Sequence, residues 1–148
     1  MKVKQLSVFL ENKPGALKRP INVLAQARLN VLALSLADTQ QFGILRLIVR
    51  DTEKAKQLLE ADGFVVKLND MVALEVSNQP GGLAAILTPL EHARVNLEYM
   101  YGFTQPQESR GVLLFRFEDP DRAIETLQRA GIHPLPEVDL FEKAPSPG

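Results

Sequence analysis

Two short segments of the chain combine residue types that can hold a small polar molecule. They are Asn12-Lys13-Pro14-Gly15-Ala16-Leu17 and Asn78-Gln79-Pro80-Gly81-Gly82-Leu83. In both segments Pro stiffens the chain, and Gly lets the backbone come close to a bound group. The N–H groups after each Gly would lie at the positive dipole end of a helix and lack partners inside it. This arrangement favours a carboxylate, to which Asn12 or Asn78 could add a side-chain contact.

The same residue types are also ordinary turn formers. Helix capping and turn formation are therefore the competing interpretation of both segments. Asn30 and Asn96 present the same choice, because each opens a predicted strand. Their carbonyl oxygens could accept a hydrogen bond from a ligand ammonium group, or they could close a loop.

Catalytic chemistry finds little support. His92 and His133 are the two histidines of the chain, and it has no cysteine. No Ser-His-Asp set, His-Glu-x-x-His helix, phosphate-binding loop or dinucleotide-binding turn is present. Glu91, Glu98 and Glu108 lack the paired spacing that acid–base catalysis needs. We therefore expect a protein that is not an enzyme and that uses no metal and no cofactor.

The composition is that of a globular protein. Hydrophobic residues make up 45% of the 148 residues and charged residues 24%, with 17 Lys and Arg against 18 Asp and Glu. This balance argues against nucleic acid as a partner, since nucleic-acid binding needs a basic surface. No apolar run could cross a bilayer, and the charged segment 1–6 lacks the apolar core of a signal peptide. We therefore expect no membrane partner and a cytoplasmic location.

The two segments belong to an internal repeat. The first segment returns as the second after 66 positions, and 28–31 meets 94–97 at the same offset. The offset then becomes 68, which matches Gly43 to Gly111, Asp51 to Asp119, Ala55 to Ala123, Leu59 to Leu127 and Gly63 to Gly131. Two extra residues are therefore expected in a loop near Gln105 to Arg110. The repeat predicts domains at 1–68 and 69–143, followed by a disordered tail at 144–148.

Each copy shows the same order of hydrophobic periodicities. Alternation from Leu6 to Leu10 predicts a strand, and helical spacing from Leu17 to Arg28 predicts a helix. Strands follow near 31–36 and 44–49, then a second helix and a short strand at 64–66. The predicted fold class is α+β, with two tandem ferredoxin-like βαββαβ units, each an antiparallel sheet with two helices on one face.

Several residues indicate where the helices begin and end. Asp51 and Asp119 are good N-caps for the second helix of each copy, and Gly63 and Gly131 are expected to end those helices. Pro20 and Pro89 fall inside the first helices, which must therefore kink or begin late.

One predicted strand of the second copy is rich in large side chains. It contains Tyr99, Met100, Tyr101 and Phe103, where the first copy has the smaller residues of 34–36. We interpret these side chains as packing in a core or an interface. The difference also predicts that two sites, if both exist, are not identical.

The chain resembles tandem ACT-domain proteins over about Val3 to Glu142. The resemblance lies in the two turns, together with Asn30-Val31 and Asn96-Leu97. ACT domains typically carry an Asn/Asp-x-Pro-Gly-x-Leu turn between the first strand and helix, and a Gly-x-Asn-Ile-like start of the second strand. Arg28 and Arg94 occupy the glycine region of that start, which is a departure from the family pattern.

The resemblance implies regulatory binding of a small ligand, usually an amino acid. It implies that the antiparallel sheets of two units pair side by side and that ligands lie at their junction, against the Pro-Gly turns. Each turn would act with the second strand of the opposite copy. The implied ligand-binding residues are Asn12, Pro14, Gly15, Ala16, Leu17, Asn30, Asn78, Pro80, Gly81, Gly82, Leu83 and Asn96.

Our first functional hypothesis is a non-enzymatic sensor that binds a free amino acid between its two ACT-like domains. Binding would alter docking to a target enzyme or regulator on another chain, or to a second copy in a homodimer. The alternative is a protein-interaction module that assembles through its sheet edges without a small ligand. A small enzyme or a nucleic-acid binder on the same fold comes last, because neither a catalytic set nor a basic face is present.

Overall fold

A computed structural model describes residues 1–38, 41–104 and 110–143 of the chain. The predicted tail lies outside this part of the chain, as does most of the predicted insertion near Gln105 to Arg110. The elements in chain order are β1 (Val3–Glu11), α1 (Lys18–Gln26), β2 (Val31–Asp38), β3 (Phe42–Val49), α2 (Thr52–Ala61), β4 (Val66–Ser77), α3 (Gly82–His92), β5 (Leu97–Thr104), β6 (Arg110–Phe117), α4 (Pro120–Arg129) and α5 (Glu137–Lys143).

The chain folds as two compact units. Within the described residues, the N-terminal unit is Lys4–Asn69, and the C-terminal unit consists of Met1–Val3 and the residues from Asp70 to 143. The division falls inside β4, because 66–77 contains no Gly or Pro that would end a strand. The last strand of the first repeat and the first strand of the second repeat are therefore one continuous element.

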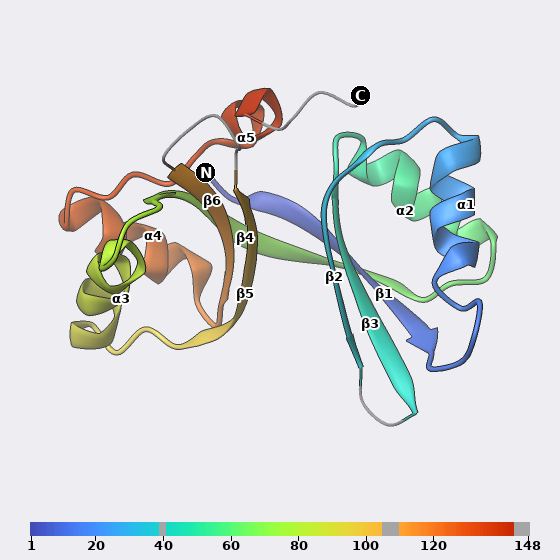
Figure 1. Cartoon of the computed structure of the whole chain (residues 1–148), viewed down its shortest axis with the longest axis horizontal. Helices are drawn as coiled ribbons and strands as arrows, with labels where there is room; N and C mark the ends of the chain where they lie inside the picture. Colours follow the sequence, from blue (N-terminus) through green and yellow to red (C-terminus); the bar gives the residue numbers. More distant parts are fainter. Residues whose placement is uncertain (39–40, 105–109, 144–148) are drawn as a thin grey trace. The chain divides into compact units, whose positions relative to one another are not determined.

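Each unit has the predicted ferredoxin-like arrangement. In the N-terminal unit the strand order is β2-β3-β1, with the start of β4 beyond β1, where Phe9 N–H donates to the Val65 carbonyl oxygen over 3.1 Å. In the C-terminal unit the order is β4-β6-β5. The neighbouring strands β1/β3, β2/β3, β4/β6 and β5/β6 are antiparallel. Figure 1 shows α1 and α2 on one face of the first sheet, and α3 and α4 on one face of the second.

The final strand expected in the C-terminal unit is reduced to a single bridge. Leu135 N–H donates to the Ala73 carbonyl oxygen over 2.8 Å, and the pairing extends no further along the described chain. The reason is that Leu135 lies between Pro134 and Pro136, and proline has no N–H to continue a ladder. The sequence prediction also missed α5, which follows at once and buries Leu140 and Phe141.

Two hydrophobic cores lie between the helices and the sheets. In the N-terminal unit the core consists of Leu6, Val8, Leu10, Leu24, Leu45, Leu47, Val49, Ala55 and Leu59. In the C-terminal unit it consists of Val72, Leu74, Val76, Ile86, Leu90, Phe115, Phe117, Ala123 and Leu127. Most members occupy equivalent positions of the repeat, as Leu59 and Leu127 do. The repeat in the sequence is thus a repeat of core packing.

The predicted helix boundaries of α2 and α4 are confirmed. The Asp51 carboxylate accepts from Lys54 N–H over 3.2 Å, and the Asp119 carboxylate accepts from Arg122 N–H over 3.1 Å. Gly63 and Gly131 follow the helices with φ of +89° and +79°. In each case the N–H of the glycine and the N–H of the next residue donate to carbonyls of the last turn, which is the Schellman ending.

The prolines act differently in the two first helices. α1 begins at Lys18, so Pro20 lies in its first turn, where a missing N–H costs no hydrogen bond. α3 begins earlier in its repeat, at Gly82, and Pro89 lies in its interior. Pro89 therefore cannot donate to the carbonyl of Ala85. The sequence predicted a kink or a late start for both helices. α1 starts late, so that its proline lies in the first turn, whereas α3 starts earlier and has its proline in its interior.

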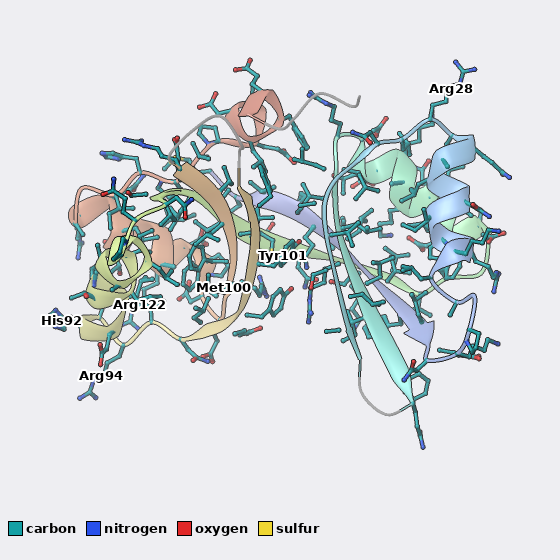
Figure 2. All side chains as sticks on the ribbon, viewed as in Figure 1. Arg28, His92, Arg94, Met100, Tyr101 and Arg122 are labelled. Atoms are coloured by element: carbon teal, nitrogen blue, oxygen red, sulfur yellow. The ribbon has the colours of Figure 1, made fainter. Side chains whose placement is uncertain are left out.

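Arg28 and Arg94 adopt the left-handed backbone conformation that favours glycine. Their φ angles are +57° and +54°, and they end α1 and α3 with the same Schellman hydrogen bonds as Gly63 and Gly131. Figure 2 shows both side chains pointing away from their own units. The arginines thus keep the backbone geometry of the family pattern at the expense of strain in the chain.

We expect Arg28→Gly and Arg94→Gly each to raise the free energy of unfolding by about 0.5–1 kcal/mol. Relief of the left-handed strain gains about 1–2 kcal/mol, and the added entropy of the unfolded chain removes about 0.4–1 kcal/mol of it. Urea unfolding followed by far-UV circular dichroism measures the change. Ala27→Gly is the matched control, because Ala27 has φ of −85° and glycine there should destabilise the protein. A loss of stability in both arginine variants would show that the backbone of Arg28 and Arg94 is not strained.

Candidate ligand-binding site

A cavity of about 330 Å³ lies beneath the turn between β1 and α1. Leu10 of β1 and Gly43 of β3 are paired neighbours in the sheet, and Leu36 extends the cavity wall onto β2. The turn lies over these strand ends, and Asn12 N–H donates to the Gln41 carbonyl oxygen over 3.1 Å. The full lining is Leu10, Glu11, Asn12, Lys13, Ala16, Leu17, Leu36 and Gly43.

The C-terminal unit has a cavity at the equivalent place. It has a volume of about 550 Å³ and lies beneath the turn between β4 and α3. Val76 and Gly111 are paired neighbours there, as Leu10 and Gly43 are in the other unit. The lining is Val76, Ser77, Asn78, Gln79, Leu83, Gly102, Phe103, Gly111 and Leu113. The two repeats therefore have equivalent cavities between a Pro-Gly turn and the ends of three strands.

The predicted turn residues divide between the cavities and their surroundings. Asn12, Ala16 and Leu17 line the N-terminal cavity, and Asn78 and Leu83 line the C-terminal cavity. Pro14 and Gly15 lie on the other side of their turn, where they line a further hollow of about 330 Å³ with Ala16 and Phe64 among others. Pro80, Gly81 and Gly82 shape the second turn but do not line its cavity.

Both turns depend on a glycine with positive φ, Gly15 at +82° and Gly81 at +88°. The next residue in each closes the turn, as Ala16 N–H donates to the Lys13 carbonyl oxygen and Gly82 N–H to that of Gln79. Part of the N–H set that the sequence offered to a ligand is thus used by the turn itself. The N–H groups of the following helix residues lack partners within the helix and are left to receive an anion.

The two helices start at different points of their repeats, and one position of their turns differs by a methyl group. A Cβ placed on Gly82 would lie 2.2 Å from the Ser77 carbonyl oxygen, so α3 can begin there only with glycine. The first repeat has Ala16 at this position, and α1 begins two residues later, at Lys18. The first N–H groups of α3 are therefore nearer to the turn than those of α1.

Asn30 and Asn96 lie apart from the cavity of their own unit. Each precedes its second strand and lies beyond the C-terminal end of α1 or α3, whereas the turn lies at the N-terminal end. Asn30 is exposed, and the Asn96 side-chain amide donates to Glu118 Oε2 over 3.4 Å. A ligand contact by these two residues, made together with the opposite repeat, stays a prediction.

The two cavities differ in charge. Glu11 and Lys13 line the N-terminal cavity, and Lys13 Nζ lies 2.8 Å from Glu11 Oε2. The hydrogen bond from Lys13, and then its positive charge, lower the pKa of the Glu11 carboxyl, which therefore stays ionised. The equivalent positions in the C-terminal cavity are Ser77 and Gln79, and none of the lining residues that the structure describes is ionisable.

Sequence reasoning missed the strand residues of both cavities, namely Leu10, Glu11, Leu36, Gly43, Val76, Ser77, Gly102, Phe103, Gly111 and Leu113. They are distant from the turns in the sequence, and only strand register brings them there. One signal was available, because Gly43 and Gly111 recur at matched positions of the repeat. Small residues that recur opposite a turn leave space for a ligand.

The large side chains of β5 divide between its two faces, as Figure 2 shows for Met100 and Tyr101. Met100 packs on the core beneath α3 and α4. Tyr101 pairs with Leu114 on the other face of the sheet, and Phe103 reaches the cavity. The predicted packing role is thus right for Met100, and Phe103 combines packing with a place in the cavity wall.

Titratable side chains also gather near the C-terminal end of α3. Figure 2 shows His92, Arg94 and Arg122 near the C-terminal end of α3, where an Arg122 guanidinium nitrogen donates to the Ala93 carbonyl oxygen over 2.6 Å. Within 1–38, 41–104 and 110–143, the His, Asp and Glu side chains form no group that could hold a metal ion. None of the helices in the described chain has both the length and the apolar character needed to cross a bilayer.

Comparison with known proteins agrees with this architecture. A family model described as "ACT domain pair" matches residues 1–143. Protein BT0572 from Bacteroides thetaiotaomicron is 39% identical, with a TM-score of 0.89 over 96% of this chain and 97% of that chain.

Two aspartate kinase regulatory subunits have a similar fold. The ligand-free one from Thermus thermophilus has a TM-score of 0.61 at 17% identity, over 86% of this chain and 91% of that one. The one from Thermus flavus has a TM-score of 0.57 at 15% identity, over 86% and 92%. No match was found among curated proteins.

Proposed function

The chain belongs to the ACT domain family, and from this premise we propose that it is a non-enzymatic regulatory protein that binds a free amino acid. The observation that carries the proposal is the pair of cavities beneath the Pro-Gly turns. They occupy equivalent places in the two repeats, and each combines apolar strand residues with an Asn at the turn. A concave, mostly apolar space with a few polar groups is typical of a small-molecule site.

The chemistry of the cavities suits an α-amino acid. The Asn12 or Asn78 side-chain amide can donate to a carboxylate, and the first N–H groups of the adjoining helix carry partial positive charge towards it. The amide and backbone carbonyl oxygens of the turn can accept from an ammonium group. The strand residues below would surround the ligand side chain.

Regulation would follow from the position of the turn. The turn joins the sheet to α1 or α3, so a ligand beneath it would connect two elements that pack only through the core. Binding would favour one arrangement of these elements over others. We propose that a target enzyme or regulator on another chain, or a second copy of this chain, responds to that change.

Thermal unfolding in the presence of each of the twenty amino acids at millimolar concentration tests the proposal. A ligand at about 100 times its dissociation constant stabilises the folded state by about 2.7 kcal/mol, which should raise Tm by roughly 5–10 °C. We expect such a rise with one amino acid or a few related ones. An unchanged Tm with all twenty, supported by the absence of heat in calorimetric titrations, would overturn the proposal.

The alternative is an interaction module that assembles through its sheet edges without a small ligand. It is supported by Leu34 and Leu36, which are about half exposed on β2, the outermost strand of its sheet. Exposed apolar residues on an outer strand can pair with another chain. Self-association by sedimentation that weakens in Leu34→Lys, together with no response to any amino acid, would favour this alternative.

A further inference from the structure

The two cavities have different walls at one matched position. Leu36 lines the N-terminal cavity, and the residue 66 positions later is Gly102 in the C-terminal cavity. Leu36 Cδ1 lies 3.6 Å from where a Cβ of Gly43 would be, so this side chain lies over the cavity floor. The N-terminal cavity is also the smaller of the two, with about 330 Å³ against about 550 Å³.

The cavity wall has no side chain at Gly102, because β5 and β6 pack too closely there to admit one. A Cβ at this position would lie 2.5 Å from the Val112 carbonyl oxygen and 2.5 Å from Leu113 Cδ2. The backbone atom cannot move away without breaking the pairing of β5 with β6. No larger residue fits there, so the space beside Phe103 and Leu113 stays open to a ligand.

The charged residues of the two cavities also favour binding in the C-terminal cavity. An amino acid in the N-terminal cavity would bring its carboxylate close to the ionised Glu11, and Lys13 is already paired with that group. In the C-terminal cavity the matched positions are Ser77 and Gln79, which repel neither end of a zwitterion. The apolar part of its wall consists of Val76, Leu83, Phe103 and Leu113. None of the described lining residues would pair with a charged ligand side chain, which would lose its water there.

We propose that the two cavities are unequal, and that the C-terminal cavity binds one free amino acid with an uncharged, apolar side chain. The N-terminal cavity, narrowed by Leu36 and occupied at its rim by the Glu11–Lys13 pair, stays empty at the same ligand concentration. This inference rests on the proposed function and adds to it the ligand class and the number of sites.

Isothermal titration calorimetry on the full chain tests the inference, with L-leucine, L-phenylalanine, L-glutamate and L-lysine as probes. Asn78→Asp and Asn12→Asp are matched variants, since both positions are exposed and Asp has nearly the same shape as Asn. The new carboxylate in Asn78→Asp should repel the carboxylate of the ligand. We expect one molecule of leucine or phenylalanine per chain, an affinity about tenfold or more weaker in Asn78→Asp, and an unchanged affinity in Asn12→Asp.

Several results would overturn the inference while leaving amino-acid binding intact. They are two molecules per chain, an equal loss in both variants, a loss in Asn12→Asp alone, and tighter binding of glutamate or lysine. If no amino acid binds the unmodified chain, the proposed function fails as well. The thermal unfolding screen identifies that case independently.

Discussion

Replacing Phe115 by Ala is expected to lower the free energy of unfolding by about 3–5 kcal/mol. Phe115 has no exposed surface, and its ring stacks on that of Phe117 with 5.7 Å between ring centroids. Truncation removes this contact and leaves a cavity. The close-packed core residues around it cannot easily move in to fill it. Urea unfolding followed by far-UV circular dichroism measures the loss, which is suitable because the chain has no Trp.

Two further variants make this result interpretable. Phe42→Ala removes the same side chain from a position that is 55% exposed and should change stability by less than about 0.5 kcal/mol. Phe115→Leu introduces the residue that the first repeat has at this place, Leu47, and should cost less than about 1.5 kcal/mol. The leucine variant still folds if the alanine variant does not. Equal losses for Phe115→Ala and Phe42→Ala would contradict the position of the core.

Gly82→Ala is expected to destabilise the protein by about 1–3 kcal/mol and to weaken ligand binding. The new Cβ would lie 2.2 Å from the Ser77 carbonyl oxygen, a backbone atom that belongs to β4. The first repeat indicates how the chain would respond, because with Ala16 at this position its helix starts two residues later. We therefore expect α3 to begin at Ala84, which moves its first N–H groups away from the cavity.

Amide hydrogen exchange of 82–86 checks the position of the helix start, and urea unfolding and calorimetric titration check stability and affinity. The loss of helix should raise the exchange rates of the Ala85 and Ile86 amides, whose first-turn protection depends on the earlier start. The reverse exchange, Ala16→Gly, is the matched control and should change stability by less than about 1 kcal/mol. Unchanged exchange, stability and affinity in Gly82→Ala would show that the close approach to Ser77 is not what sets the helix start.

Much of the fold could be predicted because its causes are local. The alternation of Leu6, Val8 and Leu10 produces a buried strand face in any register, and a capping Asp such as Asp51 bonds within its own turn. Gly63 and Gly131 end helices for the same local reason. The repeat then required both halves of the chain to have one architecture, and its core residues recur at matched positions.

The departures from prediction arise where residues distant in sequence meet. Ala73 and Leu135 form a single bridge, because prolines flank Leu135 and cannot donate to β4. The missing N–H groups have this effect only where the folded chain brings Leu135 beside β4. Arg28 and Arg94 adopt the left-handed conformation of a glycine helix ending, although their side chains disfavour it.

The sequence by itself determined the repeat, the two Pro-Gly turns and the membership of each turn in a strand–helix junction. Only the tertiary structure decided what lies beneath those turns. Strand register places Gly43 opposite Leu10 and Gly111 opposite Val76, and so opens a space of which the sequence shows only the recurring glycines. Strand pairing also places Leu36 and Gly102 at equivalent positions in the walls of the two cavities. A cavity is a property of the atoms around it, and these atoms come from three strands that are neighbours only in the folded chain.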